Sequence, residues 1–241
     1  MKLKYLMRKV SHKIFVMTDN DYNLNMKTDG EFHLISELIN EAPSDSIFFD
    51  IGAEKGDWTY FVRNKRHDLY IHLFDPNEET LEIRQNRFIG DKKIVINTCA
   101  VGNNTEDIEF FVDTYSLHRR RSVNRPGENL TIVKSIKLDD YIKKNNIEEV
   151  FFIKMDIEGH ELFALQGAIE SLKKGKIKYI QFEYGACDID SRTYLKDFYD
   201  LINDYNYKIG KIHPNHVENI ANYDRLRENF YDSNWLISRI G

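Results

Sequence analysis

The stretch Ile47–Thr59, IFFDIGAEKGDWT, decides the fold. An apolar run ends in Asp50, and two glycines, Gly52 and Gly56, open a tight turn before an amphipathic segment. Gly52 allows the backbone to pass close to a ligand, and Gly56 can adopt backbone angles that other residues avoid. This pattern predicts a strand that turns directly into a helix at a ligand-binding edge of a sheet.

Short apolar runs alternate with amphipathic segments on both sides of this stretch. The expected strands are 47–50, 70–74, 94–101, 150–155 and 177–183, and the expected helices are 29–40, 57–66, 78–88, 161–174 and 192–205. A β-rich insertion (strands 108–112 and 131–138) separates the third and fourth strands, and a hairpin of 207–213 and 235–240 ends the chain. The alternation predicts an α/β fold, with a mostly parallel seven-stranded sheet and helices on both faces. Residues 1–28 are expected to form an N-terminal arm, as a hairpin or an extended segment, before a single domain over 29–241.

Composition excludes several classes of protein. The 241 residues are 41% hydrophobic and carry a net charge of −5 with both signs interspersed, so no overall basic field draws the chain to nucleic acid. No apolar run is long enough to span a membrane, and the basic residues of the N-terminal segment argue against a signal peptide. The cysteines, Cys99 and Cys187, make neither a disulfide framework nor a zinc site. The same charge balance gives no attraction to an anionic membrane. We expect a cytoplasmic protein; the oligomeric state is not predicted.

The glycine turn differs from the dinucleotide fingerprint, because it lacks Gly-x-Gly-x-x-Gly and carries Glu54, whose charge is unfavourable beside a pyrophosphate. S-adenosylmethionine has a sulfonium and an amino acid in place of phosphates. Asp50 could accept hydrogen bonds from its ammonium group, and the helix N-terminus suits its carboxylate. An ordinary glycine turn without a ligand explains the pattern equally well.

The ends of the next two strands supply further candidates. Asp75 ends the second strand, where a carboxylate can hold ribose hydroxyls. As an alternative, Asp75 caps the helix that follows Pro76. The end of the third strand would lie near the adenine, with Cys99 and Ala100 as small neighbours, although a buried structural thiol explains Cys99 equally well.

Four stretches carry a resemblance to a known family: FDIGAEKGDWT (49–59), FDPNEET (74–80), IKLDDYI (136–142) and FIKMDIEGHELFALQGA (152–168). With IQFEYG (180–185), they resemble the FkbM family of methyltransferases over nearly the whole chain. The resemblance implies a Rossmann-like class I methyltransferase fold and S-adenosylmethionine-dependent O-methylation of sugars, polyketides and related hydroxylated compounds. The family more often has Glu at the position of Asp75 and a small polar residue at that of Glu54. The expected cofactor contacts are Glu31, Asp50, Ile51, Gly52, Ala53, Gly56, Asp57, Trp58, Asp75, Pro76, Cys99, Ala100 and Asp156.

Methyl transfer to a hydroxyl requires the acceptor oxygen to be held behind the methyl group and to lose its proton. The fourth strand and the turn after it supply Lys154, Asp156, Glu158 and His160, and Glu183 ends the neighbouring strand. We expect Asp156 to position the reactants, Glu158 or His160 to act as the base, and Glu183 to support them. The alternatives are stabilisation of a helix start by Glu158, a solvated loop histidine at position 160, and a structural ion pair of Lys154 with Asp156 or Glu183.

The sequence also contains candidate ligands for a metal ion and for the methyl acceptor. Asp156 and Glu183 could coordinate Mg²⁺, but a protein base is favoured because a third oxygen ligand is missing, and no metal site is predicted. In the polar segment 114–128, His118, Arg119, Arg120 and Arg121 could bind an anionic or nucleotide-linked acceptor, or could form an ordinary solvated loop. Two other functions stay open: an NAD-dependent sugar dehydrogenase or epimerase, which Glu54 disfavours, and a non-catalytic nucleoside-binding module.

Overall fold

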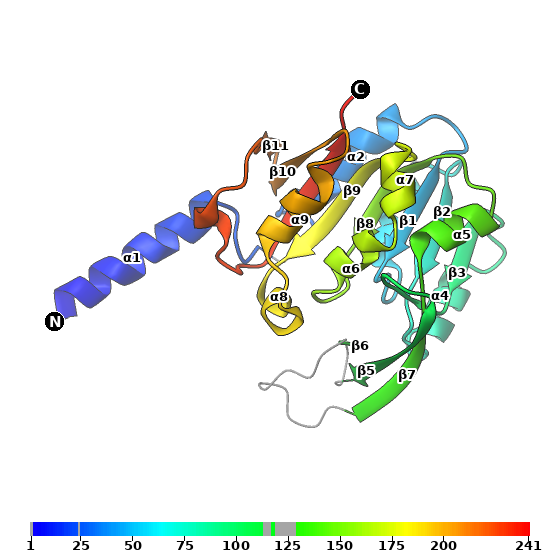
Figure 1. Cartoon of the computed structure of the whole chain (residues 1–241), viewed down its shortest axis with the longest axis horizontal. Helices are drawn as coiled ribbons and strands as arrows, with labels where there is room; N and C mark the ends of the chain where they lie inside the picture. Colours follow the sequence, from blue (N-terminus) through cyan, green and yellow to red (C-terminus); the bar gives the residue numbers. More distant parts are fainter. Residues whose placement is uncertain (1, 24, 113–116, 119–128) are drawn as a thin grey trace.

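The computed structural model describes residues 2–23, 25–112, 117–118 and 129–241 (Figure 1). The described helices are α1 (Lys2–Thr18), α2 (Glu31–Glu41), α3 (Asp57–Lys65), α4 (Leu81–Arg87), α5 (Leu138–Lys144), α6 (Glu161–Gln166), α7 (Ile169–Lys173), α8 (Ala186–Ser191) and α9 (Leu195–Ile202), with a 3-10 turn at Arg225–Arg227. The strands are β1 (Ile47–Ile51), β2 (Tyr70–Phe74), β3 (Ile94–Asn97), β4 (Ala100–Val101), β5 (Glu106–Val112), β6 (Leu117–His118), β7 (Asn129–Ile136), β8 (Val150–Met155), β9 (Ile177–Tyr184), β10 (Tyr207–His213), β11 (His216–Asn219) and β12 (Ser233–Arg239).

The main sheet has the strand order β11-β10-β12-β9-β8-β1-β2-β3. The pairs from β9 across to β3 are parallel, whereas β12 lies antiparallel between β9 and β10. The expected α/β fold with a mostly parallel sheet is therefore confirmed, and so is the pairing of the two last predicted strands. The predicted number of seven strands is wrong, because β11 turns back and pairs with β10 at the edge.

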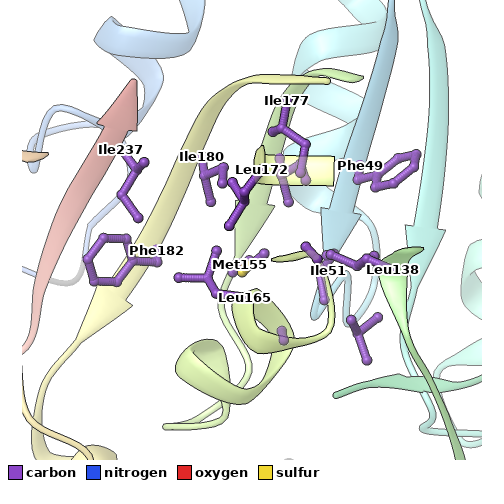
Figure 2. Close-up of a cluster of buried hydrophobic side chains, with 14 of the residues drawn as sticks. Phe49, Ile51, Leu138, Met155, Leu165, Leu172, Ile177, Ile180, Phe182 and Ile237 are labelled. Atoms are coloured by element: carbon purple, nitrogen blue, oxygen red, sulfur yellow. The ribbon is translucent and has the colours of Figure 1, made fainter. Parts of the chain in front are cut away.

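Side chains that alternate along β1 enter two different cores. Phe49 and Ile51 pack with α5, α6, α7 and α9, whereas Phe48 packs with α2 and α3 on the other face. Figure 2 shows the first of these cores, in which Leu165 and Leu172 lie against strand residues of the sheet. Full burial of such a side chain contributes about 1.5–3 kcal/mol. Helices on both faces explain why these strands carry apolar side chains on both of their faces.

A second, smaller sheet has the order β4-β7-β5-β6 and extends away from the main sheet (Figure 1). It confirms the β-rich insertion, but the single strand expected over 94–101 is wrong. The chain leaves the main sheet after Asn97, whose carbonyl accepts from the Asp75 amide at 3.1 Å and whose side chain donates to the Leu73 carbonyl at 3.0 Å. Three residues after Asn97, β4 begins and pairs with β7 in the small sheet.

The helix predicted over 161–174 is in fact two helices, α6 and α7, that meet at Gly167 and Ala168. A Cβ atom on Gly167 would lie 2.1 Å from the Gly102 carbonyl oxygen, so the chain requires glycine here. Asp139 stabilises the second helix, because its carboxylate accepts hydrogen bonds from the Glu170 and Ser171 amides at 2.9 Å. The helix predicted over 192–205 is likewise shorter, since it is confined to α9 and is preceded by the separate helix α8.

The hairpin or extended arm expected over residues 1–28 is wrong for the described part that forms α1, a helix that projects from the body (Figure 1). The segment after α1 is fixed to the C-terminal strands. The ammonium of Lys211 in β10 lies 2.6 Å from an Asp19 carboxylate oxygen and 2.5 Å from one of Asp21. The Tyr22 amide donates to the Asp232 carbonyl at 2.9 Å.

Lys211→Ala should lower the free energy of unfolding by about 3–5 kcal/mol, because it removes the buried counter-ion of Asp21 and leaves Asp19 with Arg227 alone. Lys211 is only 1% exposed, so water does not replace the lost contact. Urea denaturation at neutral pH measures the change. The matched control is Lys208→Ala, at the exposed position of the same strand. Equal losses of unfolding free energy in the two variants would refute a stabilising role for the ion pairs of Lys211 with Asp19 and Asp21.

Candidate active site

Two neighbouring pockets open at the carboxyl ends of the parallel strands. Pocket A is lined by Ile51, Gly52, Glu54, Phe74, Asp75, Pro76, Asn77, Cys99, Ala100, Val101, Phe110, Asp156, Ile157, Glu158 and His160. Pocket B is lined by Met26, Asp29, Glu31, Asp156, Glu158, Glu183, Ala186, Cys187, Asp232 and Asn234. Asp156 and Glu158 belong to both linings, so the pockets meet at these two carboxylates.

The floor of pocket A is made by backbone groups that touch directly. Gly52 has a φ of +83°, and a Cβ atom there would lie 1.8 Å from the Asp156 carbonyl oxygen. The Gly52 amide donates to the Phe74 carbonyl at 2.9 Å, and the Asp156 amide donates to the Ile51 carbonyl at 3.0 Å. These contacts hold the ends of β1, β2 and β8 together, which explains why the turn requires glycine.

Asp75 is held rigidly at the end of β2. One carboxylate oxygen accepts from the Glu54 amide and the other from the Asn77 amide, both at 2.8 Å. The buried Arg84 guanidinium lies 3.1 Å from the same carboxylate. Burial raises the pKa of Asp75, while Arg84 and the two amides lower it. The alternative of a helix cap is wrong, because α4 begins only at Leu81; Asp75 instead closes the turn beside the pocket.

The predicted cofactor residues fall into two groups. Pocket A is lined by Ile51, Gly52, Asp75, Pro76, Cys99, Ala100 and Asp156, and pocket B by Glu31 and Asp156. The remaining five support the turn and line neither pocket. Asp50 accepts a hydrogen bond from the Thr59 hydroxyl at 2.6 Å, and Asp57 is exposed beside Arg87. The other three, Ala53, Gly56 and Trp58, are buried. Cys99 is buried in the core, as its structural alternative expects, and it also lines pocket A.

Lys154 lies between the acidic residues of the site. It is 4% exposed, it neighbours Asp50 across the sheet, and its ammonium is 3.1 Å from an Asp156 carboxylate oxygen. Burial acts to lower the pKa of Lys154, but Asp156, Glu31 and Asp50 raise it above its usual value. The expected ion pair of Lys154 with Asp156 is confirmed, and it fixes Asp156 at the junction of the two pockets.

Glu31 is the first residue of α2 and carries a buried carboxyl group at the wall of pocket B. It is 3% exposed, and its Oε1 atom has no hydrogen-bond partner among the described residues. Burial raises its pKa to about 7, against the lowering effect of Lys154. A carboxyl group with this pKa near neutrality loses its proton readily when a cation binds beside it.

Glu31→Gln should stabilise the protein at pH 8 by up to about 3 kcal/mol and should have little effect at pH 5. The folded-state pKa of about 7 exceeds the ordinary value of 4.5, so the folded chain holds more protons between these limits and stability falls as pH rises through them. Thermal unfolding at both pH values measures the difference. Glu37→Gln, at an exposed position of α2, is the control; a gain of equal size at pH 5 would contradict this cause.

The predicted catalytic carboxylates come together, but His160 lies apart from pocket B. Burial and the carboxylates around it, Asp156 first among them, raise the pKa of Glu183 well above its usual value. Glu158 has a φ of +58° and accepts a hydrogen bond from the Cys187 thiol at 2.9 Å. His160 lines pocket A and stacks on Phe163 with ring centroids 4.6 Å apart. The alternative of a solvated loop histidine is wrong, because His160 is 6% exposed.

Three further expectations concern a metal site, an arginine-rich acceptor site and a membrane span. Among the described residues, no group of three or more His, Cys, Asp and Glu side chains is arranged to hold a metal ion. Arg119, Arg120 and Arg121 lie outside the described residues, and His118 is described only as part of β6. No helix in the described ranges is long and apolar enough to cross a membrane.

Sequence reasoning missed most of one wall of pocket B. Asn234 lies opposite Glu183 in the β12–β9 register, and its side chain contacts Gln181 at 3.1 Å and Asp29 at 3.4 Å. Asp232 lies just before β12. The antiparallel pairing of β12 with β9 brings the start of β12 to the end of β9, a contact between distant segments that no local sequence pattern indicates.

The antiparallel strand β12 between β9 and β10, together with a pocket across the ends of β1 and β2, is the architecture of a class I methyltransferase. The methyltransferase FkbM domain matches residues 50–209, and the chain belongs to this family. It is similar to the hexuronic acid methyltransferase AglP of Haloferax volcanii, with 24% identity over 169 residues that cover 70% of this chain and 69% of the relative. Its fold is similar to that of an rRNA methylase from Streptococcus thermophilus, with a TM-score of 0.50 at 12% identity over 87% of this chain and 96% of the other.

Proposed function

We propose that this methyltransferase transfers the methyl group of S-adenosylmethionine to a hydroxyl group of a sugar. The observation that carries the proposal is the sharing of Asp156 and Glu158 by the two pockets. A nucleoside in pocket A and an acceptor in pocket B would meet at these carboxylates. When bound, S-adenosylmethionine supplies an electrophilic methyl group on a positively charged sulfur.

The residues of pocket A suit the nucleoside part of this cofactor. Oδ1 of Asp75 is engaged by the Asn77 amide and by Arg84, whereas Oδ2 accepts one backbone hydrogen bond from Glu54 and keeps a second lone pair for a ribose hydroxyl. Cys99, Ala100 and Phe110 offer a small and apolar surface to an adenine ring. Glu54 and Asn77 complete the polar side of the pocket.

The negative charge at the junction of the two pockets suits the sulfonium and ammonium groups of S-adenosylmethionine. Glu31, Asp156 and Glu158 face this region, and the Oε1 atom of Glu31 is a buried acceptor that lacks a hydrogen-bond partner among the described residues. An ammonium group of the cofactor would supply that partner. A cation in this acidic surrounding would also favour the ionised form of Glu31.

Glu183 is the best candidate for the general base. Asp156 is paired with Lys154, and Glu158 accepts the Cys187 thiol, whereas burial and neighbouring carboxylates raise the pKa of Glu183. A carboxylate with a raised pKa takes a proton from a hydroxyl more readily than an ordinary one. In this account Asp156 positions, Glu158 lines the junction, and Glu183 removes the proton of the acceptor hydroxyl.

A sugar acceptor is supported by the polar wall of pocket B and by the relative. Asp29, Asp232 and Asn234 offer side-chain oxygens that hydroxyl groups can donate to. The relative AglP is named for hexuronic acid, which is a sugar with several hydroxyl groups and one carboxyl group. The acidic residues of this wall disfavour a nucleic acid, which is a polyanion, and the relative favours a sugar.

Incubation of the full chain with radiolabelled S-adenosylmethionine and a panel of hexoses, hexuronic acids and nucleotide-linked sugars tests the proposal. We expect label to enter a sugar as a methyl ether that is stable to mild alkali. An alkali-labile methyl ester or an N-methyl product would overturn the hydroxyl assignment. Binding of cofactor with no transfer to any acceptor would instead favour the non-catalytic alternative.

A further inference from the structure

Helix α1 exposes an apolar stripe that the described part of the fold leaves uncovered. The stripe consists of Leu3, Met7, Val10, Ile14 and Met17, which are 50–72% exposed. Their spacing of four and three residues places them on one face of the helix. The helix projects away from both sheets, as Figure 1 shows, so the core does not require these side chains.

The charge of this segment is opposite to that of the remaining chain. Residues 1–18 contain five Lys and Arg residues and no Asp or Glu, while the whole chain has a net charge of −5, which leaves −10 for the other residues. Within the helix, Lys4 and Arg8 lie on one side of the apolar stripe and Lys9 and Lys13 lie on the other. All four are exposed. The helix is therefore both amphipathic and strongly basic.

We propose that α1 binds an anionic membrane surface and lies parallel to it. The apolar stripe would enter the boundary between headgroups and acyl chains, and the flanking lysines and arginine would contact lipid phosphates. Helix α1 has 17 residues and carries several charges, so this proposal concerns adsorption and not a membrane span. The contacts of Lys211 with Asp19 and Asp21 fix the base of the helix to the enzyme.

A second copy of the chain is the competing occupant, because the spacing of the stripe also fits a coiled coil. Charge disfavours it. Two copies of α1 would bring ten positive charges together without an acidic residue in the segment to pair with them. An anionic surface instead neutralises these charges, and the acidic remainder of the chain is repelled from it.

Sedimentation of the full chain with phospholipid vesicles tests the proposal. We expect binding to vesicles of phosphatidylcholine mixed with phosphatidylglycerol, weaker binding at high salt, and none to pure phosphatidylcholine. Val10→Glu in the middle of the stripe should reduce binding by about tenfold or more. Tyr5→Glu, which adds the same charge on the opposite face, should reduce it by less than about threefold.

Thermal unfolding should be unchanged in both variants, so that loss of binding is not loss of folding. The proposal is wrong if the wild-type chain fails to bind anionic vesicles, or if it binds charged and uncharged vesicles equally. It is also wrong if light scattering shows that Val10→Glu converts a larger assembly into a smaller one, because the stripe would then face a second copy.

Discussion

Gly52→Ala should abolish binding of S-adenosylhomocysteine, the expected product, and should lower the free energy of unfolding by about 2–5 kcal/mol. The alanine Cβ would lie 1.8 Å from the Asp156 carbonyl oxygen, which is backbone and cannot rotate away. A φ of +83° adds a second cost for any residue with a side chain. The turn after β1 and the turn after β8 would therefore separate, and the junction of the two pockets would be lost. Chemical denaturation and titration calorimetry measure the two effects.

Gly90→Ala is the matched control for this variant. Gly90 has a nearly identical φ of +79°, but a Cβ atom there would meet nothing within 4 Å. It should therefore show only the conformational cost of about 1–2 kcal/mol and should bind the product normally. Equal losses in the two variants would mean that the contact between the two turns does not matter.

Glu183→Gln should lower kcat by about 10²–10⁴-fold and leave the affinity for S-adenosylhomocysteine unchanged. Glutamine keeps the size of the side chain but cannot accept a proton from the acceptor. The wild-type kcat should rise with pH as the Glu183 carboxyl group ionises, and this ionisation should fall above the usual range of a glutamate, because burial and nearby carboxylates raise its pKa. The variant should lose this part of the pH profile. Steady-state kinetics over a range of pH measures both.

Glu82→Gln, at an exposed position of α4, is the control for removal of a carboxylate and should have wild-type kinetics. Glu158→Gln tests the alternative base at the junction. If Glu183→Gln retains full kcat while Glu158→Gln loses it, the roles assigned to these two residues are reversed. That outcome would leave the position of the site unchanged.

The strand ends of the site could be predicted from sequence because each lies next to a long apolar run. Asp75 directly follows such a strand and Lys154 lies within one, and their places at pocket A and beside Asp156 are confirmed. The alternation of side chains along β8 also separates Lys154 from the core that contains Ile153 and Met155. Local periodicity is sufficient for these features, since parallel strands expose their carboxyl ends at one edge.

Features that depend on distant contacts could not be predicted in this way. The break after Gly167 depends on the carbonyl of Gly102, and the wall at Asn234 depends on which strand β12 pairs with. The support roles of Asp50 and Trp58 depend on how helix α3 packs, because α3 contains Trp58 and also Thr59, the donor to Asp50. For α1, charged residues at close spacing obscured an amphipathic helix that needs no core.

Titration calorimetry with S-adenosylhomocysteine, NAD and an Asp75→Asn variant tests the central claim that pocket A holds the nucleoside of S-adenosylmethionine. The wild-type chain should bind S-adenosylhomocysteine and not NAD. Asp75→Asn should weaken binding by about tenfold or more, which is about 1.4 kcal/mol, whereas Asp57→Asn, outside the pocket, should not. Binding of NAD in place of S-adenosylhomocysteine, or equal affinity in wild type and Asp75→Asn, would contradict the account.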